Sequence, residues 1–146
     1  MRIREIMKTR VETISASDSA ETARTRMASR RIRHLVVTAG REVLGVISER
    51  DLDRLGTYRQ IETVGENMTA PAVTVAPETT LRQAANLLRG RTIGCLPVLE
   101  DGKLAGIVTT TDLLELLGRG AEKPNPTGRR PVLKDRGPRR KLARVS

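Results

Sequence analysis

The chain has 146 residues, a formal net charge of +10 at pH 7, one cysteine and one aromatic residue, Tyr58. A lone Cys95 excludes an internal disulfide and a zinc site built from several cysteines, and its expected role is that of a small buried apolar residue. The scarcity of aromatic residues predicts an aliphatic core and removes the usual stacking platform for single-stranded nucleic acid. No apolar run reaches the roughly 18 residues of a membrane span, and no apolar signal region follows the N-terminus. We therefore expect a soluble, cytoplasmic protein.

Most of the positive charge lies at the C-terminal end. From Arg119 onward, ten Lys and Arg residues face only Glu122 and Asp135, a net of +8, which leaves +2 for residues 1–118. Residues 119–146 are also rich in Pro and Gly, which disfavour a long helix, so they are predicted to form a flexible basic tail. Such a tail can be a simple solvated segment. Binding to nucleic acid, or to an acidic protein partner, is the alternative function that its charge suggests.

The first half of the chain predicts one series of elements. Residues 3–7 place apolar side chains on one face of a helical turn, and a short strand follows around Ile14. Several possible N-caps at 15–18 precede a helix. Two strands then form a hairpin that turns at Ala39-Gly40, and a short helix over 48–56 ends the series.

The second half repeats this series in the same order. Asp101-Gly102 gives a strong turn signal for its hairpin, and the closing helix over 112–117 is apolar on more than one face, which predicts packing on two sides. Because units of this size cannot bury an apolar face alone, the halves are expected to stack around one shared core with pseudo-two-fold symmetry. The predicted boundaries are 1–60, 61–118 and 119–146.

One motif occurs twice, at an offset of 61 residues. The sequence Gly45-Val46-Ile47-Ser48-Glu49-Arg50-Asp51-Leu52 is echoed by Gly106-Ile107-Val108-Thr109-Thr110-Thr111-Asp112-Leu113. A hydroxyl followed three residues later by an acid fits a helix capping box, which needs no ligand. The same carboxylate could instead accept hydrogen bonds from the hydroxyls of a ribose, beside backbone N–H groups that can meet a phosphate. The residues alone leave both interpretations open.

The repeated pattern resembles the cystathionine β-synthase (CBS) domain over residues 3–118. The second half carries the resemblance in Ile93, Leu96-Pro97-Val98, Gly102, Gly106-Ile107-Val108-Thr109 and Asp112-Leu113, and the first half in Ile32, Leu35-Val36-Val37, Gly45-Val46-Ile47-Ser48 and Asp51-Leu52. The resemblance implies an α+β fold of two β-α-β-β-α repeats, that is, a Bateman module with two clefts between its repeats. It also implies a homodimer and a regulatory role rather than catalysis, with no obligatory cofactor and an as yet unknown regulated protein.

The ligands that the resemblance implies contain adenosine: AMP, ADP, ATP, NAD(H) or S-adenosylmethionine. By position, Asp51 and Asp112 would hold ribose hydroxyls, and Ser48 and Thr109 would meet the phosphate or ribose. The apolar residues expected to line the adenine pockets are Ile14, Val46, Val75 and Ile107.

The two halves differ where the family often has a basic residue near the phosphates. Arg33 and His34 precede the first strand of the first hairpin, whereas Gly94 and Cys95 occupy the equivalent positions of the second. With Arg50 nearby, the cleft of Asp51 is therefore predicted to suit a phosphorylated ligand better than the cleft of Asp112. No catalytic Ser-His-acid or Cys-His set, metal cluster or phosphate-binding Gly-Lys-Ser/Thr loop can be assembled, so an enzyme is not expected.

Overall fold

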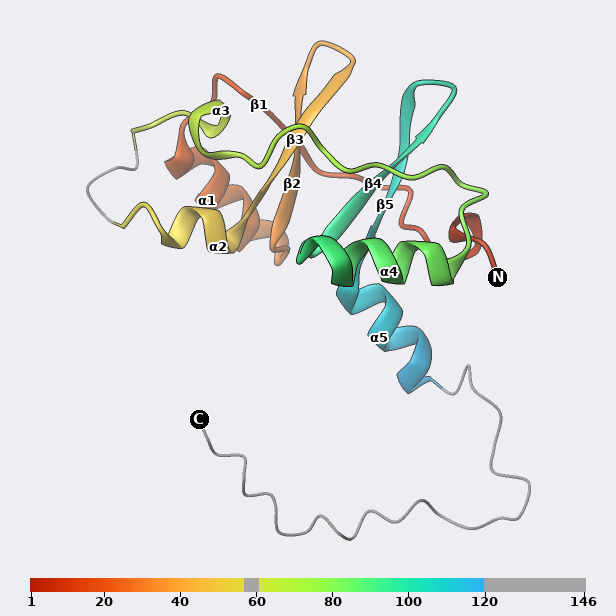
Figure 1. The fold of residues 1–146 in the computed structure, drawn as a ribbon. Helices are drawn as coiled ribbons and strands as arrows, with labels where there is room; N and C mark the ends of the chain where they lie inside the picture. The colour runs from red at the N-terminus through yellow and green to blue at the C-terminus, as the bar shows by residue number, and fades with distance from the viewer. Residues whose placement is uncertain (57–60, 120–146) are drawn as a thin grey trace, which may run out of the picture. The chain divides into compact units, whose positions relative to one another are not determined.

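The computed structural model of the protein describes residues 1–56 and 61–119. Tyr58 and the predicted basic tail beyond Arg119 lie outside the described residues. The fold is a mixed α+β arrangement in which the predicted order of elements occurs twice (Figure 1). Its elements are η1 (Ile3–Glu5), β1 (Thr13–Ser15), α1 (Ala20–Arg30), β2 (His34–Ala39), β3 (Glu42–Ser48), α2 (Glu49–Asp53), α3 (Val64–Asn67), α4 (Leu81–Arg91), β4 (Cys95–Glu100), β5 (Lys103–Thr109) and α5 (Thr110–Gly118).

Each half is built on an antiparallel hairpin. In the first half β2 pairs with β3, and β1 adds to the other side of β2 in parallel. In the second half β4 pairs with β5, but the counterpart of β1 is reduced to a single parallel bridge between Val75 and Val98. The predicted strand there is thus only partly formed. Its backbone still joins β4, because Leu99 donates its N–H to the Val75 carbonyl at 2.9 Å.

Local sequence signals account for the turns and for most of the helix starts. Asp101 and Gly102 both have positive φ, 53° and 77°, as a tight hairpin turn of the primed type requires. The N-cap of α1 is Ser19, whose side chain accepts a hydrogen bond from the Thr22 N–H, and not one of the residues 15–18. Asp18 is engaged differently, because its carboxylate accepts from the Ser15 N–H at 3.1 Å and closes the turn before the helix.

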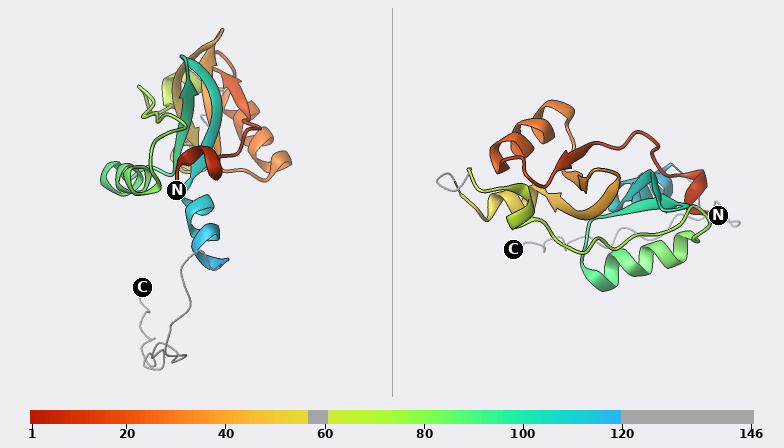
Figure 2. Two further views of the ribbon diagram at one scale, coloured as in Figure 1. Left: turned by 90° about the vertical axis from the view of Figure 1, so that its right-hand side faces the viewer. Right: turned by 90° about the horizontal axis from the view of Figure 1, so that it is seen from above.

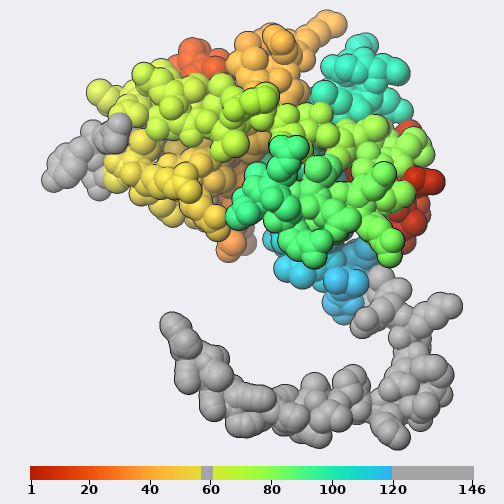
Figure 3. Space-filling view, in the orientation of Figure 1, coloured from red at the N-terminus to blue at the C-terminus, as the bar shows by residue number. Residues whose placement is uncertain are grey.

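Two segments cross between the halves in opposite directions. The N-terminal crossing segment, residues 1–12, leads from η1 beside the second half to β1 in the first. The middle crossing segment, residues 68–80, leads from α3 beside the first half to α4 in the second (Figure 1). Seen from above, the two segments run along opposite sides of the pair of hairpins (Figure 2). The middle crossing segment and α4 lie on the face that is turned to the viewer in Figure 3, beside α2 and α3.

Because of this crossing, the apolar core of each half contains a residue from the other half's leading segment. Ile3 is completely buried in the core of the second half, and Val64 is completely buried in the core of the first. The prediction of one shared core is therefore wrong: two cores form, and each is completed by the other half's leading segment. A separate apolar cluster made by Val36, Cys95 and Ile107 joins the two hairpins. We call this cluster the seam.

The motif glycines are explained by the same crossing. A Cβ on Gly106 would lie 2.8 Å from the Lys8 carbonyl oxygen, and a Cβ on Gly45 would collide with the Thr69 carbonyl oxygen. The crossing segments thus pass directly over the centres of β5 and β3. Glycine is needed at both positions because the backbone of another segment approaches closely there.

The start of α5 packs on one side, and the predicted packing on a second side stays a prediction. Leu113 packs against the core of the second half, whereas Leu114 is 62% exposed. Within residues 1–56 and 61–119, none of the helices combines the length and apolar character needed to span a bilayer.

Candidate functional site

The repeated hydroxyl and carboxylate sit where each hairpin runs into a helix. At the end of β3, the Ser48 N–H and hydroxyl donate to Asp51 Oδ2 at 2.9 and 3.0 Å, and the Asp51 N–H donates to Ser48 Oγ at 3.2 Å. This is a complete capping box. The capping interpretation is therefore confirmed at the first copy of the motif.

The capping box uses only one oxygen of the Asp51 carboxylate. The other oxygen, Oδ1, lies 3.6 Å from Arg54 Nη1, which is an ion-pair distance but longer than a hydrogen bond. Within residues 1–56 and 61–119, Oδ1 accepts no hydrogen bond. The side chain is 13% exposed, so Asp51 holds a mostly buried acceptor that a ligand hydroxyl could satisfy.

The basic residues predicted beside Asp51 lie at the same end of the hairpin. His34 is directly opposite Ser48 in the antiparallel register, so the two side chains lie on one face of the sheet. The Glu49 N–H donates to the Arg33 carbonyl at 2.9 Å, which joins Arg33 to the start of α2. The side chain of Arg33 is 79% exposed, with its Nε 3.8 Å from the Glu49 carboxylate, and Arg50 is also exposed. We call Arg33, His34, Ser48, Arg50 and Asp51 the first site.

His34 is held differently from the two arginines. Its ring is half-buried against Gly94 of the other hairpin, where a Cβ would lie 2.5 Å from His34 Nε2. Burial lowers the pKa of His34 below its usual 6.5; Asp51 opposes this shift, Arg33 adds to it and Glu49 opposes it. The imidazole is therefore mainly neutral at pH 7, and it offers a hydrogen bond rather than a full charge.

The second copy of the motif has the same capping geometry but a different partner. The Thr109 N–H donates to Asp112 Oδ2 at 2.8 Å, and the Asp112 N–H donates to Thr109 Oγ1 at 3.1 Å. The other carboxylate oxygen, Oδ1, accepts from Lys8 Nζ at 2.5 Å. Lys8 belongs to the N-terminal crossing segment, and sequence reasoning missed it. We call Lys8, Thr109 and Asp112 the second site.

The strand opposite Thr109 also differs from its counterpart in the first half. Cys95 stands directly opposite Thr109, where the first half pairs His34 with Ser48. Cys95 is 4% exposed in the seam, and burial raises the pKa of its thiol to about 12. Its predicted role as a small buried residue matches this environment. The second site therefore lacks the imidazole and guanidinium groups that the first site has at the equivalent positions.

The four residues predicted to line adenine pockets lie in three different surroundings. Ile14 is 2% exposed inside the core of the first half. Ile107 belongs to the seam and Val46 packs against it, and their backbones form bridges to Lys8 and Thr69 of the crossing segments. Val75 is mostly buried in the core of the second half. The two predicted pockets are thus not visible as clusters, because Ile14 and Val75 lie in the cores of the two halves whereas Val46 and Ile107 lie at the seam.

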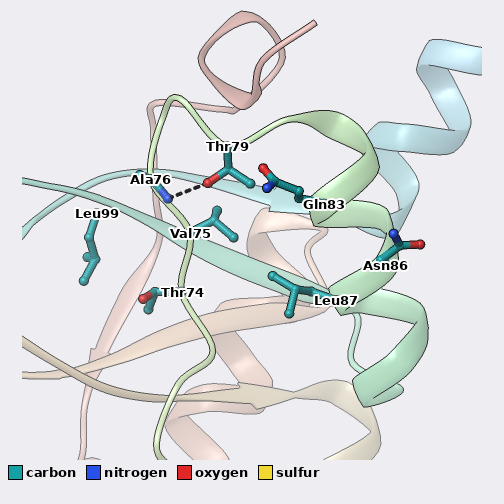
Figure 4. Close-up of a pocket in the computed structure, with 8 residues that line it drawn as sticks. All are labelled: Thr74, Val75, Ala76, Thr79, Gln83, Asn86, Leu87 and Leu99. Atoms are coloured by element: carbon teal, nitrogen blue, oxygen red, sulfur yellow. Dashed lines mark hydrogen bonds between the residues drawn. The ribbon is translucent and has the colours of Figure 1, made fainter.

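A pocket of about 720 Å³ lies on the second half, and none of its lining residues belongs to either copy of the motif (Figure 4). Its lining residues are Thr74, Val75, Ala76, Thr79, Gln83, Asn86, Leu87 and Leu99. Val75 is the only predicted site residue among them. Thr79 Oγ1 is already engaged there, because it accepts the Ala76 N–H at 3.1 Å. The pocket is uncharged and does not include Asp51 or Asp112, so it does not coincide with either predicted cleft.

Metal binding finds no support in the described part of the chain, where no three His, Cys, Asp or Glu side chains gather as a metal site would require.

Comparison with known proteins identifies the family. The model of the CBS domain matches this chain twice, over residues 3–56 and 61–119. An inosine-5'-monophosphate dehydrogenase of Korarchaeum cryptofilum is 36% identical over 104 residues, which cover 70% of this chain and 21% of that enzyme. The chain thus spans about a fifth of the length of this relative. A CBS domain-containing protein of Dictyostelium discoideum is 30% identical over 140 residues, covering 85% of this chain and 96% of that protein.

The fold has close counterparts among solved structures. The structure of CBSX2 in complex with AMP is 27% identical, with a TM-score of 0.72, and the match covers 83% of this chain and 98% of that chain. The CBS-domain containing protein ATU1752 from Agrobacterium tumefaciens is 26% identical, with a TM-score of 0.76 and coverage of 80% and 99%. The repeat, its order of elements and these matches agree: the chain belongs to the CBS domain family and carries two tandem CBS repeats.

Proposed function

We propose that this protein is a regulatory module that binds an adenine nucleotide at the first site. The observation that carries the proposal is the Asp51 carboxylate, which is fixed through Oδ2 by Ser48 while Oδ1 accepts no hydrogen bond within the described residues. A preorganised carboxylate suits a ribose, whose neighbouring hydroxyls are donors, when its second oxygen accepts no hydrogen bond and has only a 3.6 Å ion pair, here with Arg54. Because Asp51 is mostly buried, a hydroxyl that fills this position gains more than it would at an exposed acid.

Neighbouring residues would bind the phosphate and the adenine of the nucleotide. Arg33 and Arg50 are exposed cations near the start of α2, and they would attract the phosphate group. His34 would offer a hydrogen bond at the same face as Ser48. Val46 would supply the apolar surface for adenine, beside the middle crossing segment that bridges it at Thr69. AMP is the first ligand to test, because a similar structure holds AMP.

Calorimetric titration of the full chain tests the proposal. The ligands are AMP, ADP, ATP, NADH and S-adenosylmethionine, each carried to millimolar concentration. We expect at least one of the adenine nucleotides to bind, with an affinity that falls as ionic strength rises, since the exposed arginines are screened by salt. No heat from any of the five ligands would reject the proposal.

A role in regulation also needs a partner. We propose a homodimer, supported by the 62% exposure of Leu114 next to the buried face of α5. Sedimentation of Leu114→Ser beside the unaltered chain tests this assembly. The net charge of +8 beyond residue 118 favours a second candidate function, in which the tail binds nucleic acid. Steeply salt-dependent binding of duplex DNA or RNA that is lost on deletion of residues 119–146 would support it.

A further inference from the structure

We infer that Lys8 closes the second site to adenine nucleotides, so that each chain binds one nucleotide, at Asp51. The inference rests on the proposed function of the first site and names the residue that makes the two sites different. Its basis is the single contact in which Lys8 Nζ donates to Asp112 Oδ1 at 2.5 Å.

Lys8 and Thr69 occupy equivalent places in the two halves. They are 61 residues apart, the same offset that relates Asp51 to Asp112. The backbone of Lys8 exchanges two hydrogen bonds with Ile107, at 2.9 and 3.0 Å, and the backbone of Thr69 exchanges two with Val46 at the same two distances. The crossing segments are therefore held alike at both sites, and the side chain is what differs.

Because of that difference, the Oδ1 atoms of Asp51 and Asp112 have different partners. Both carboxylates are fixed through Oδ2 by the capping geometry. At the second site Oδ1 accepts a hydrogen bond from the Lys8 ammonium. At the first site the position equivalent to Lys8 holds a threonine, and Oδ1 has only the longer 3.6 Å ion pair with Arg54. The oxygen that would accept a ribose hydroxyl is thus already occupied at Asp112.

Displacing Lys8 would be unfavourable for an incoming nucleoside. The Asp112 side chain is only 6% exposed, so its charge depends on an internal partner, while the Lys8 side chain is 60% exposed and can supply that partner with its charged end partly hydrated. The Lys8 ammonium also brings a full positive charge to Asp112, and this attraction adds to the hydrogen bond itself. A ribose hydroxyl is neutral, and it cannot replace the ammonium without leaving a buried charge poorly compensated.

The positions equivalent to His34 and Arg33 offer no compensation for that loss. Cys95 opposite Thr109 is a buried thiol, and Gly94 has no side chain, where the first site has His34 and Arg33. Among the described residues, Lys8 is the one cation in an ion pair with Asp112, and a phosphate at the second site would compete for it. Using Lys8 in that way would again remove the ammonium from Asp112.

Titration of adenosine and of AMP into the full chain and three variants tests the inference. Lys8→Thr installs the side chain of the first site, Lys8→Arg keeps a cation, and Thr69→Lys places the ammonium beside Asp51. We expect one adenosine and one AMP per chain for the unaltered protein and for Lys8→Arg, and two adenosine molecules for Lys8→Thr, because adenosine has the ribose but no phosphate that the second site would have to meet. Thr69→Lys should weaken AMP binding at the first site by at least about tenfold. Two bound molecules of either ligand in the unaltered protein, or one adenosine in Lys8→Thr, would overturn the inference.

A ligand-free measurement separates this inference from the proposed function. A double-mutant cycle of Lys8→Thr and Asp112→Asn in urea unfolding should show a favourable coupling between the two side chains. Absence of coupling would mean that Lys8 does not hold Asp112, and the inference would be wrong. If coupling is present but no variant binds AMP, the proposed function is wrong and the Lys8–Asp112 contact only stabilises the fold.

Discussion

The imidazole of His34 rests against Gly94 across the boundary between the two hairpins, so closely that a Cβ on Gly94 would lie 2.5 Å from Nε2. The two residues occupy neighbouring positions in the repeat, since Gly94 is the equivalent of Arg33 and Cys95 the equivalent of His34. The His34 ring of the first half thus fills the space that a side chain at position 94 of the second half would occupy. This contact couples the first site to the packing of the two hairpins.

Gly94→Ala should destabilise the protein through this contact. The added methyl group would push against the far end of the His34 side chain, which can turn aside, so we expect a cost at or below the lower end of the about 1–3 kcal/mol that is typical of overpacking. The matched control is Gly90→Ala, because Gly90 lies in α4 with nothing within 4 Å of an added Cβ. That change should stabilise the protein by about 0.5–1 kcal/mol. Urea unfolding compares the two variants, and equal effects would mean that His34 moves aside freely.

The pH dependence of stability should reveal the burial of His34. Its pKa is lowered in the folded protein, chiefly by burial, so the unfolded chain binds more protons near pH 6 and the free energy of unfolding falls as the pH drops. The loss should begin near the unfolded pKa of 6.5 and continue down to the folded pKa. Because His34 is the only histidine, its imidazole NMR signal gives the folded pKa directly.

His34→Gln is the control for that pH effect. The part of the acid-induced loss that is due to His34 is the difference between the unaltered chain and this variant, measured at about pH 7.5 and about pH 5. We expect the variant to lose less stability on acidification. A titration midpoint at or above 6.5, or identical losses in both proteins, would show that the ring is not buried as the structure describes.

Cys95 should be unreactive until the seam opens. The thiolate is the reactive form, and burial raises the pKa of this thiol to about 12. Near pH 8 we expect labelling by a maleimide to be at least about a hundredfold slower in the folded protein than in urea. A Cys95→Ala, Ser29→Cys variant provides an exposed comparison on α1. Equal rates at positions 95 and 29 would contradict the burial of Cys95.

Ile3→Ala tests the contribution of the N-terminal crossing segment to the second core. Ile3 is fully buried there, and truncating such a side chain typically costs about 2–5 kcal/mol. Ile61→Ala removes the same atoms from a residue that is 86% exposed, and it should change the free energy of unfolding by less than about 0.5 kcal/mol. A small effect of Ile3→Ala would mean that the segment is not docked on the second half.

The local structure was largely readable from the sequence. Turn chemistry at Asp101-Gly102 and the hydroxyl–acid spacing at Ser48 and Asp51 depend on residues close together in the chain, so they predicted the hairpin turn and the capping box. The repeat offset of 61 residues predicted that the two halves would have the same order of elements and be related by pseudo-two-fold symmetry. These signals also carried the resemblance to the CBS domain, which the family match confirms.

Contacts between distant segments were not readable in this way. Lys8 and Asp112 are 104 residues apart, and no periodicity in either stretch indicates that they meet. One signal could have helped: Gly45 and Gly106 interrupt apolar strands, and a glycine in a strand often marks a close backbone approach. Combined with the repeat, these glycines could have suggested that another segment crosses each hairpin. These glycines would not have shown which side chain of the crossing segment reaches Asp112.

The binding of AMP to Asp51→Ala and Asp112→Ala, measured by calorimetry beside the unaltered chain, tests the central claim most directly. Both substitutions remove the carboxylate of a capping box, and Asp112→Ala also removes the partner of Lys8, so the free energy of unfolding of each variant is measured beside its AMP binding. We expect Asp51→Ala to weaken AMP binding at least about tenfold and Asp112→Ala to leave it nearly unchanged. Equal losses in the two variants, or a larger loss in Asp112→Ala, would contradict the assignment of the nucleotide to the first site.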